Sequence, residues 1–173
     1  YGAHRIEGIG DKHVPWIHNI RNMDMVAAID DQATIDIMRL FNSENGQKYL
    51  IEKGVSEEMI NKLDLFGISS IANIIGCIKM AKYYEMDSSK VLFTVATDSM
   101  EMYKSRVKEE LEDRGEFSHE EAAVVYNRDL MGIGIDNMME MTYYDKKRMH
   151  NLKYFTWIEQ QGKTVEELDA QWY

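Results

Sequence analysis

The run Val91-Leu92-Phe93-Thr94-Val95-Ala96-Thr97-Asp98 is a short, almost continuously apolar segment. Such a run is typical of a parallel β-strand that is covered on both faces. A helix is predicted before it, from Ser69 to about Met86, because isoleucines recur there at helical spacing. A second apolar run, residues 25–29, precedes that helix and predicts another buried strand. Strand, helix and strand in this order predict a βαβ unit with a right-handed crossover.

The sequence after Asp98 has a helical pattern throughout. Two capping boxes, at residues 118–121 and 164–167, mark helix starts in this part of the chain. The predicted fold class is therefore α/β, with the βαβ portion in residues 1–105. Residues 106–173 are expected to form a helical C-terminal extension packed on that portion.

Composition limits the partners that this chain can bind. Its 173 residues suit one domain with a real core. The net charge of −10, from 30 acidic and 20 basic side chains, argues against nucleic acid or an anionic membrane surface as a partner. No apolar run reaches the roughly 18 residues that a membrane-spanning helix needs. We therefore expect a cytoplasmic protein, or a piece of one.

Cysteine and histidine residues give little sign of metal chemistry. The single Cys77 excludes an internal disulfide and lies on the apolar side of a helical pattern, so it is expected to be a packed thiol. The five histidines form no pair at helical spacing i, i+4. No metal site is therefore predicted.

Three short motifs are candidates for a ligand site. Gly8-Ile9-Gly10 allows close approach of a backbone to a ligand, but it lacks the flanking strand and third glycine of a dinucleotide fingerprint. Ser69 and Ser70 stand at a predicted helix start, where a hydroxyl either caps the helix or points at a cofactor. Thr97-Asp98 ends the predicted strand, where α/β proteins place ligands.

The order of these motifs resembles that of a known enzyme family. His4-Arg5-Ile6-Glu7-Gly8-Ile9-Gly10 comes first, then the strand 25–29, then Gly67-Ile68-Ser69-Ser70, then the strand 91–97. This order resembles the C-terminal portion of pyridoxal-phosphate enzymes of fold type II, the cysteine synthase and tryptophan synthase β class. The resemblance covers about residues 3–105.

The resemblance implies a function and a set of site residues. It implies β-elimination or β-replacement on a small amino acid, a serine or cysteine derivative, with pyridoxal phosphate as cofactor. Ser69 is similar to the hydroxyl that hydrogen-bonds the pyridine nitrogen. Gly8, Ile9 and Gly10 are similar to the loop on the substrate side of the ring, and Thr97 would flank the ring. The complete enzyme is expected to be a homodimer.

The chain also departs from the family pattern. The Schiff-base lysine, the substrate loop and the phosphate cradle of this family lie upstream of the matched segments, and this sequence contains none of them. Ile71 replaces the usual glycine after the two serines, and residues 106–173 are similar to an added tail. The chain is thus expected to bind pyridoxal phosphate only together with the missing portion, and to be inactive alone. Two alternatives remain open: a non-catalytic interaction or regulatory subunit, and half of a split enzyme.

Overall fold

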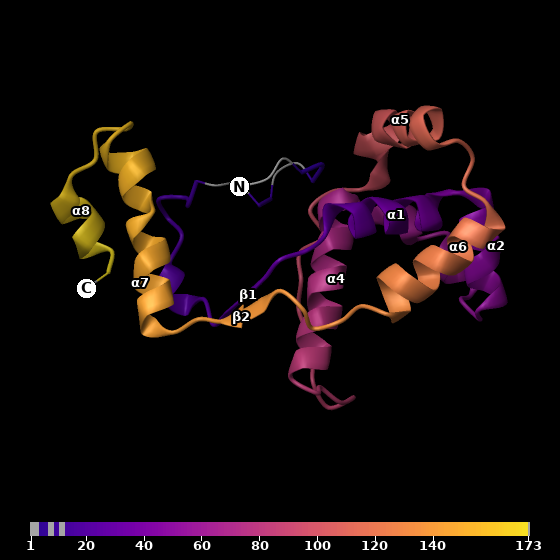
Figure 1. Ribbon diagram of the computed structural model, residues 1–173, viewed down its shortest axis with the longest axis horizontal. Helices are drawn as coiled ribbons and strands as arrows, with labels where there is room; N and C mark the ends of the chain where they lie inside the picture. Colours follow the sequence, from indigo (N-terminus) through magenta and orange to yellow (C-terminus); the bar gives the residue numbers. More distant parts are fainter. Residues whose placement is uncertain (1–3, 7–8, 11–12, 173) are drawn as a thin grey trace. The chain divides into compact units, whose positions relative to one another are not determined.

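The computed structural model describes residues 4–6, 9–10 and 13–172 (Figure 1). Its contacts divide the chain into two compact units. We call residues 4–6, 9 and 28–136 the central unit, and residues 10, 13–27 and 137–172 the terminal unit. Each unit is described by itself.

The central unit is helical. Its elements in chain order are α1 (Asp31–Asn42), α2 (Glu44–Glu52), α3 (Glu57–Ile60), the 3₁₀ turn η2 (Leu63–Leu65), α4 (Ile68–Tyr83), the 3₁₀ turn η3 (Met100–Tyr103), α5 (Lys104–Arg114), α6 (His119–Val125) and the π-helical turn η4 (Tyr126–Met131). The predicted helix after Gly67 is confirmed as α4. The predicted capping box at Ser118 and Glu121 is confirmed at the start of α6.

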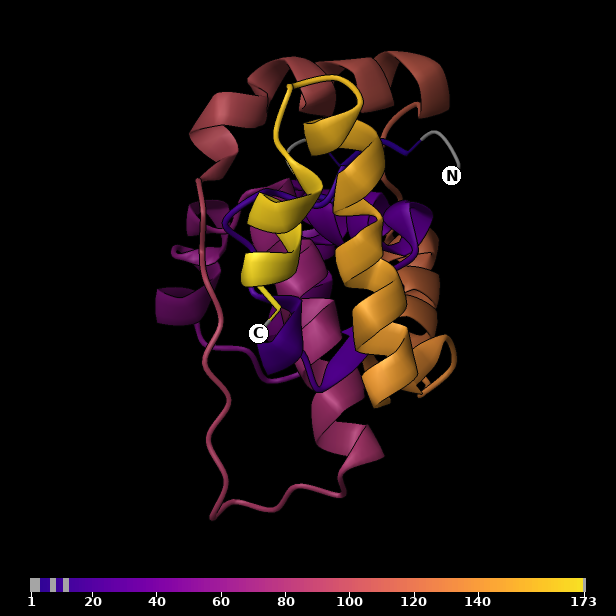
Figure 2. The ribbon, with the colours of Figure 1, turned by 90° about the vertical axis from the view of Figure 1, so that its left-hand side faces the viewer.

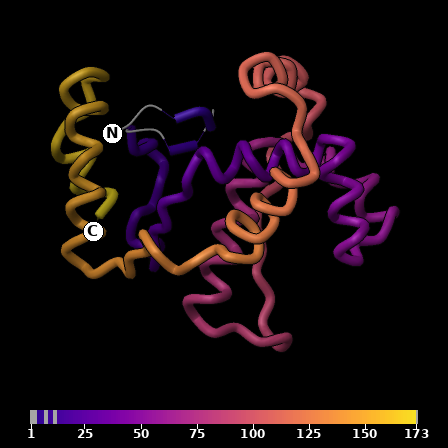
Figure 3. The backbone as a smooth tube through the Cα atoms, turned by 45° about the vertical axis from the view of Figure 1, so that its right-hand side comes forward, coloured from indigo at the N-terminus to yellow at the C-terminus, as the bar shows by residue number. Residues whose placement is uncertain are grey.

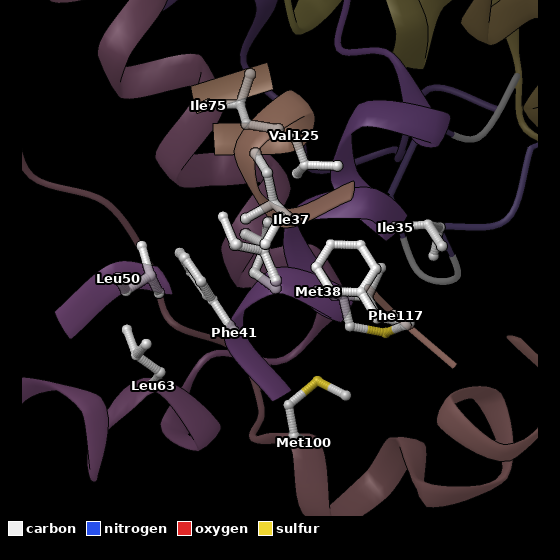
Figure 4. Close-up of a cluster of buried hydrophobic side chains, with 14 of the residues drawn as sticks. Ile35, Ile37, Met38, Phe41, Leu50, Leu63, Ile75, Met100, Phe117 and Val125 are labelled. Atoms are coloured by element: carbon white, nitrogen blue, oxygen red, sulfur yellow. The ribbon is translucent and has the colours of Figure 1, made fainter. Parts of the chain in front are cut away.

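Helix α1 lies at the centre of the hydrophobic core. Asp30 caps it by accepting a hydrogen bond from the Gln32 amide. Every residue from Thr34 to Phe41 is buried, so the helix is covered on all sides rather than along one stripe. Figure 4 shows side chains from α1 meeting side chains from α2, α4, α6 and the segments around them.

A buried carboxylate ties α1 to later elements. Asp36 is 2% exposed, and its carboxylate accepts hydrogen bonds from Arg114 (2.6 Å), Arg128 (3.0 Å) and Gln32 (2.9 Å). Three donors satisfy the buried charge, as buried charges require. The pairs with Arg114 and Arg128 link α1 to α5 and η4.

The terminal unit combines helices with a small sheet. Its elements are the 3₁₀ turn η1 (Ile20–Asn22), β1 (Met25–Ala27), β2 (Met138–Glu140), α7 (Tyr143–Asn151), the π-helical turn η5 (Tyr154–Ile158) and α8 (Val165–Ala170). The strands pair antiparallel, with Val26 opposite Met139. The predicted capping box at Thr164 and Glu167 is confirmed at α8.

A buried lysine joins the two ends of the terminal unit. Lys153 is 1% exposed. Its Nζ donates hydrogen bonds to the carbonyl oxygens of Trp16 (2.8 Å) and His18 (2.7 Å) and to Gln171 Oε1 (2.8 Å). Burial lowers the pKa of this ammonium group. All three N–H donors have acceptors, so this ammonium group links residues 16–18 to Gln171 through three hydrogen bonds.

Acidification is expected to weaken the terminal unit through His150. This imidazole is 2% exposed, and Nε2 donates to the Leu168 carbonyl oxygen (3.1 Å). Burial lowers the pKa of His150 below its ordinary value of about 6.5, so the folded unit favours the neutral ring. The free energy of unfolding that the buried neutral ring contributes is fully present above about pH 6.5. It is lost as the pH falls from there to the lower pKa of His150 in the folded state.

Tryptophan fluorescence tests this expectation, because Trp16, Trp157 and Trp172 all lie in the terminal unit. Urea midpoints should fall between about pH 7 and pH 5 in the parent chain. His150→Gln retains an N–H donor without titrating in this range, and it should flatten the dependence. An equal fall in both proteins would contradict the assignment to His150.

The predicted strand 91–97 is absent, and this expectation was wrong. Residues 91–97 form an irregular, exposed segment between α4 and η3, drawn in Figure 2 without helix or strand and seen in Figure 3 as a stretch without helical coiling. No strand among the described residues pairs with this segment, so its backbone forms no ladder. The predicted parallel βαβ pairing is likewise replaced by the antiparallel pair β1–β2.

At the coarse level, the chain is a mixture of helices and strands, and helices predominate. The expected boundary between residues 105 and 106 stays a prediction, while contacts group the chain into the two units above. By length and composition, no single helix of the described residues qualifies as a membrane span. Glu57–Leu65 and Ile68–Tyr83 qualify only jointly, as a pair bent by 116°.

Candidate functional site

The candidate site is built on the first turn of α4. Gly67 precedes this helix, and its amide donates a hydrogen bond to the Asp98 carbonyl oxygen (2.9 Å). A Cβ atom at position 67 would collide with the Asp98 carboxylate and lie 2.9 Å from the Asp98 backbone oxygen. Glycine is therefore required here by the close approach of two backbone segments.

Ser70 completes the junction between α4 and the segment that ends at Asp98. Its hydroxyl is buried, accepts a hydrogen bond from the Thr97 amide (3.2 Å) and faces the Asp98 carbonyl oxygen as a donor (3.4 Å). One turn further along α4, Asn73 Nδ2 donates to the Val95 carbonyl oxygen (2.9 Å). Side chains of α4 therefore hold the C-terminal end of the 91–97 segment.

The Asp98 carboxylate adds a polar group to this junction. It accepts hydrogen bonds from Thr97 Oγ1 (3.1 Å) and from the Tyr103 hydroxyl (2.5 Å), which comes from η3. The short phenol–carboxylate distance is typical of a charge-assisted hydrogen bond. The sequence alone assigned no role to Tyr103. A tyrosine five residues after an acidic residue is too common a pattern to predict that the two side chains meet.

The structure brings together some of the predicted site residues. Ser69 is 4% exposed and lies on the first turn of α4, in the same junction as Thr97, which is exposed. Ile9 is partly buried and packs against the core of the central unit. Gly10 is exposed with φ of 73° and belongs to the terminal unit, so it is not placed relative to Ser69. Gly8 lies outside the described residues.

The two lysines of α4, Lys79 and Lys82, bind the loop at residues 131–136. Lys79 is 5% exposed, and its Nζ lies 3.3 Å from Asp136 Oδ1. Lys82 Nζ donates to the carbonyl oxygens of Met131 (3.1 Å) and Ile133 (2.6 Å). These contacts fasten residues 131–136 to α4.

The first turn of α4 carries the groups that bear on the expected cofactor contact. The first turn of α4 carries a neutral hydroxyl at Ser69, its N-cap residue Gly67 makes no side-chain cap, and Thr97 is held at this turn by the Ser70 hydroxyl. A neutral hydroxyl is a suitable hydrogen-bond partner for a ring nitrogen, and the partial positive charge at a helix start favours electron-rich groups. Among the described residues, no group of three or more His, Cys, Asp or Glu side chains is arranged to hold a metal ion.

Comparison of the chain with protein-family models, curated proteins and solved structures finds no match.

Proposed function

We propose that this chain supplies part of the active site of a pyridoxal-phosphate-dependent enzyme of fold type II. The substrate would be a small amino acid, a serine or cysteine derivative, and the reaction β-elimination or β-replacement. The observation that carries the proposal is the junction at α4, where the Gly67-Ile68-Ser69-Ser70 segment meets Thr97-Asp98. The family resemblance requires the same two segments to meet at the cofactor ring.

The residues of this chain would have distinct tasks. When bound, the cofactor supplies an electron sink for the substrate carbanion. Ser69 would hydrogen-bond the ring nitrogen, and Thr97 would flank the ring. Gly67 and Ser70 would act as positioning residues, because their contacts set the place of Thr97 relative to α4. The lysine and the phosphate cradle would come from a portion absent from this sequence, and the complete enzyme would be a homodimer.

A titration with 4′-deoxypyridoxine 5′-phosphate tests the proposal on the complete enzyme, in which this chain is joined to the portion that supplies the lysine and the phosphate cradle. This analogue lacks the aldehyde, so it cannot form an imine with surface lysines. We expect saturable binding that shifts the NMR amide signals of residues 67–70 and 97–98, and no such effect in this chain alone, which lacks the phosphate cradle. Saturable shifts confined to other residues, or no saturation at about 10 mM ligand, which corresponds to less than about 3 kcal/mol of binding free energy, would contradict it.

Neighbouring serines provide a matched pair of variants. Ser69→Ala should weaken analogue binding by about 2–10-fold, the usual range for one lost hydrogen bond. Ser70→Ala should instead lower the free energy of unfolding of the central unit by about 1–2 kcal/mol, because the Thr97 amide and the Asp98 carbonyl lose a buried partner. Unchanged analogue affinity in Ser69→Ala would remove this serine from the proposed site.

The second candidate function is a non-catalytic interaction or regulatory subunit. The exposed apolar side chains of residues 91–95 favour it, because large apolar patches on soluble proteins are commonly interaction sites. The same NMR titration separates the two candidates, since a purely structural homologue would show no saturable effect at residues 67–70.

A further inference from the structure

A cavity in the central unit lies between the end of α1, the start of α2, and α5 with the turn that follows it. Its volume is about 290 Å³, near the lower end of the range for small-molecule sites. None of its lining residues belongs to α4 or to the terminal unit, so the inference does not depend on the proposed cofactor site. The size of the cavity restricts a ligand to a small molecule.

One part of the cavity wall is apolar. Met38 and Phe117 are buried and belong to the core cluster of the central unit (Figure 4). Val107 is half-buried, and Leu111 is 50% exposed. Apolar surface therefore continues from the core to the mouth of the cavity. Such a wall favours burial of an aliphatic group of a ligand.

Arg39 brings a buried positive charge to the same cavity. It is 7% exposed, and its Nη2 donates a hydrogen bond to the Gly115 carbonyl oxygen (2.7 Å). Its Nη1 has no hydrogen-bond partner among the described residues, and the ion pair of this atom with Glu121 Oε1 spans 3.8 Å. Burial lowers the pKa of Arg39, because the charged form is partly deprived of solvent. A carboxylate in the cavity would compensate this cation and satisfy its donors.

Acceptors for a positively charged group line the cavity as well. Glu116 directly follows Gly115, is exposed, and makes no ion pair or hydrogen bond within the described part of the chain. Asn42 and Asn45 use their Nδ2 groups to bind backbone carbonyl oxygens (2.9 Å each), so their Oδ1 atoms remain available as acceptors. The cavity therefore offers a cation, a carboxylate and an apolar wall to one ligand.

We propose that this cavity binds a small α-amino acid with an aliphatic side chain. The carboxylate of the ligand pairs with Arg39, its ammonium group pairs with Glu116, and its side chain packs on Leu111 and Phe117. An α-amino acid carries both charges on one carbon atom, and Arg39 binds the residue that directly precedes Glu116. A simple anion would instead be repelled by the Glu116 carboxylate, so the zwitterion is favoured.

A ligand series tests the proposal without mutation of the buried arginine. L-Leucine added to this chain should shift the NMR amide signals of residues 38–45 and 107–117 in a saturable manner, with a Kd below about 10 mM. 4-Methylpentanoate lacks the ammonium group and 3-methylbutylamine lacks the carboxylate, so each should bind at least about tenfold more weakly. The proposal is overturned by shifts confined to residues 67–70 and 97–98, or by no saturation at about 50 mM leucine. Binding of either partial ligand as tightly as leucine would also overturn it.

Surface variants separate ligand contact from folding. Glu116→Gln should weaken leucine binding about 3–10-fold without weakening 4-methylpentanoate binding, because that ligand has no ammonium group. Glu101→Gln, the same change at an exposed glutamate outside the cavity, should affect neither ligand. Leu111→Trp should fill the mouth of the cavity and abolish leucine binding, and unchanged circular dichroism establishes that the central unit remains folded. Parent-like leucine affinity in either Glu116→Gln or Leu111→Trp would overturn the proposal.

Discussion

Replacing Lys153 by methionine is expected to lower the free energy of unfolding of the terminal unit by about 2–4 kcal/mol. The methionine fills much of the lysine volume but donates no hydrogen bond. The carbonyl oxygens of Trp16 and His18 and the side chain of Gln171 would then lose the donor that joins them. Relief from burying a cation offsets part of this loss, because burial alone disfavours the charged ammonium. Leaving three acceptors without a donor costs more than this relief gains.

Tryptophan fluorescence during urea unfolding measures this effect in the right unit, since all three tryptophans belong to the terminal unit. Lys163→Met is the matched control. Lys163 pairs with Glu167 (3.0 Å) at the surface and lies 5.4 Å from the Trp16 ring centroid, so its removal should cost about 1 kcal/mol or less. Equal midpoints for Lys153→Met and Lys163→Met would show that the hydrogen bonds of the buried lysine do not stabilise the terminal unit.

Local sequence signals predicted the helices well. The serine and threonine caps at α6 and α8 depend on residues three apart in the chain, and both are present with their reciprocal hydrogen bonds. Helix α4 was predicted from the spacing of its isoleucines, and it begins within one residue of the expected start. Such signals need no knowledge of the rest of the fold.

Strand partners could not be predicted in the same way. The run 91–97 has the composition of a buried strand, but a strand forms only where a neighbouring edge completes its hydrogen bonds. Residues 138–140, in a region predicted to be helical, pair instead with β1. This pairing joins segments more than a hundred residues apart, and nothing in three methionine- and glutamate-rich residues indicates it.

Only part of the candidate site could be predicted, because its contacts also depend on how distant segments pack. The family resemblance implied that the helix start and Thr97 lie at one cofactor ring, and in the structure the two segments meet through Ser70. The sequence did not reveal that Ser70, rather than Ser69, faces Thr97, because successive helical residues point about 100° apart and the choice depends on how α4 is rotated. The role of Lys153 was missed because a lysine beside other basic residues usually indicates an exposed helix surface.

Two glycines of the α4 region should respond in opposite directions to alanine. Gly76 lies inside α4, and a Cβ there would meet only Ile29 Cδ1 at 3.8 Å, an ordinary contact. Gly76→Ala should therefore stabilise the central unit by about 0.5–1 kcal/mol through helix propensity. Gly67→Ala should destabilise it by about 2–3 kcal/mol, because the new methyl group collides with Asp98 and breaks the amide hydrogen bond at this junction.

Circular dichroism during urea unfolding measures both variants, since the central unit holds most of the helices. Binding of the cofactor analogue adds a second readout that stability alone does not move. Gly67→Ala should separate Thr97-Asp98 from the first turn of α4 and so weaken analogue binding in the folded protein. Gly76→Ala should leave binding unchanged, because it lies more than two turns further along the helix. If Gly67→Ala unfolds at the parent midpoint, the close approach at Asp98 is not a constraint, and the proposed site loses the contact that positions Thr97.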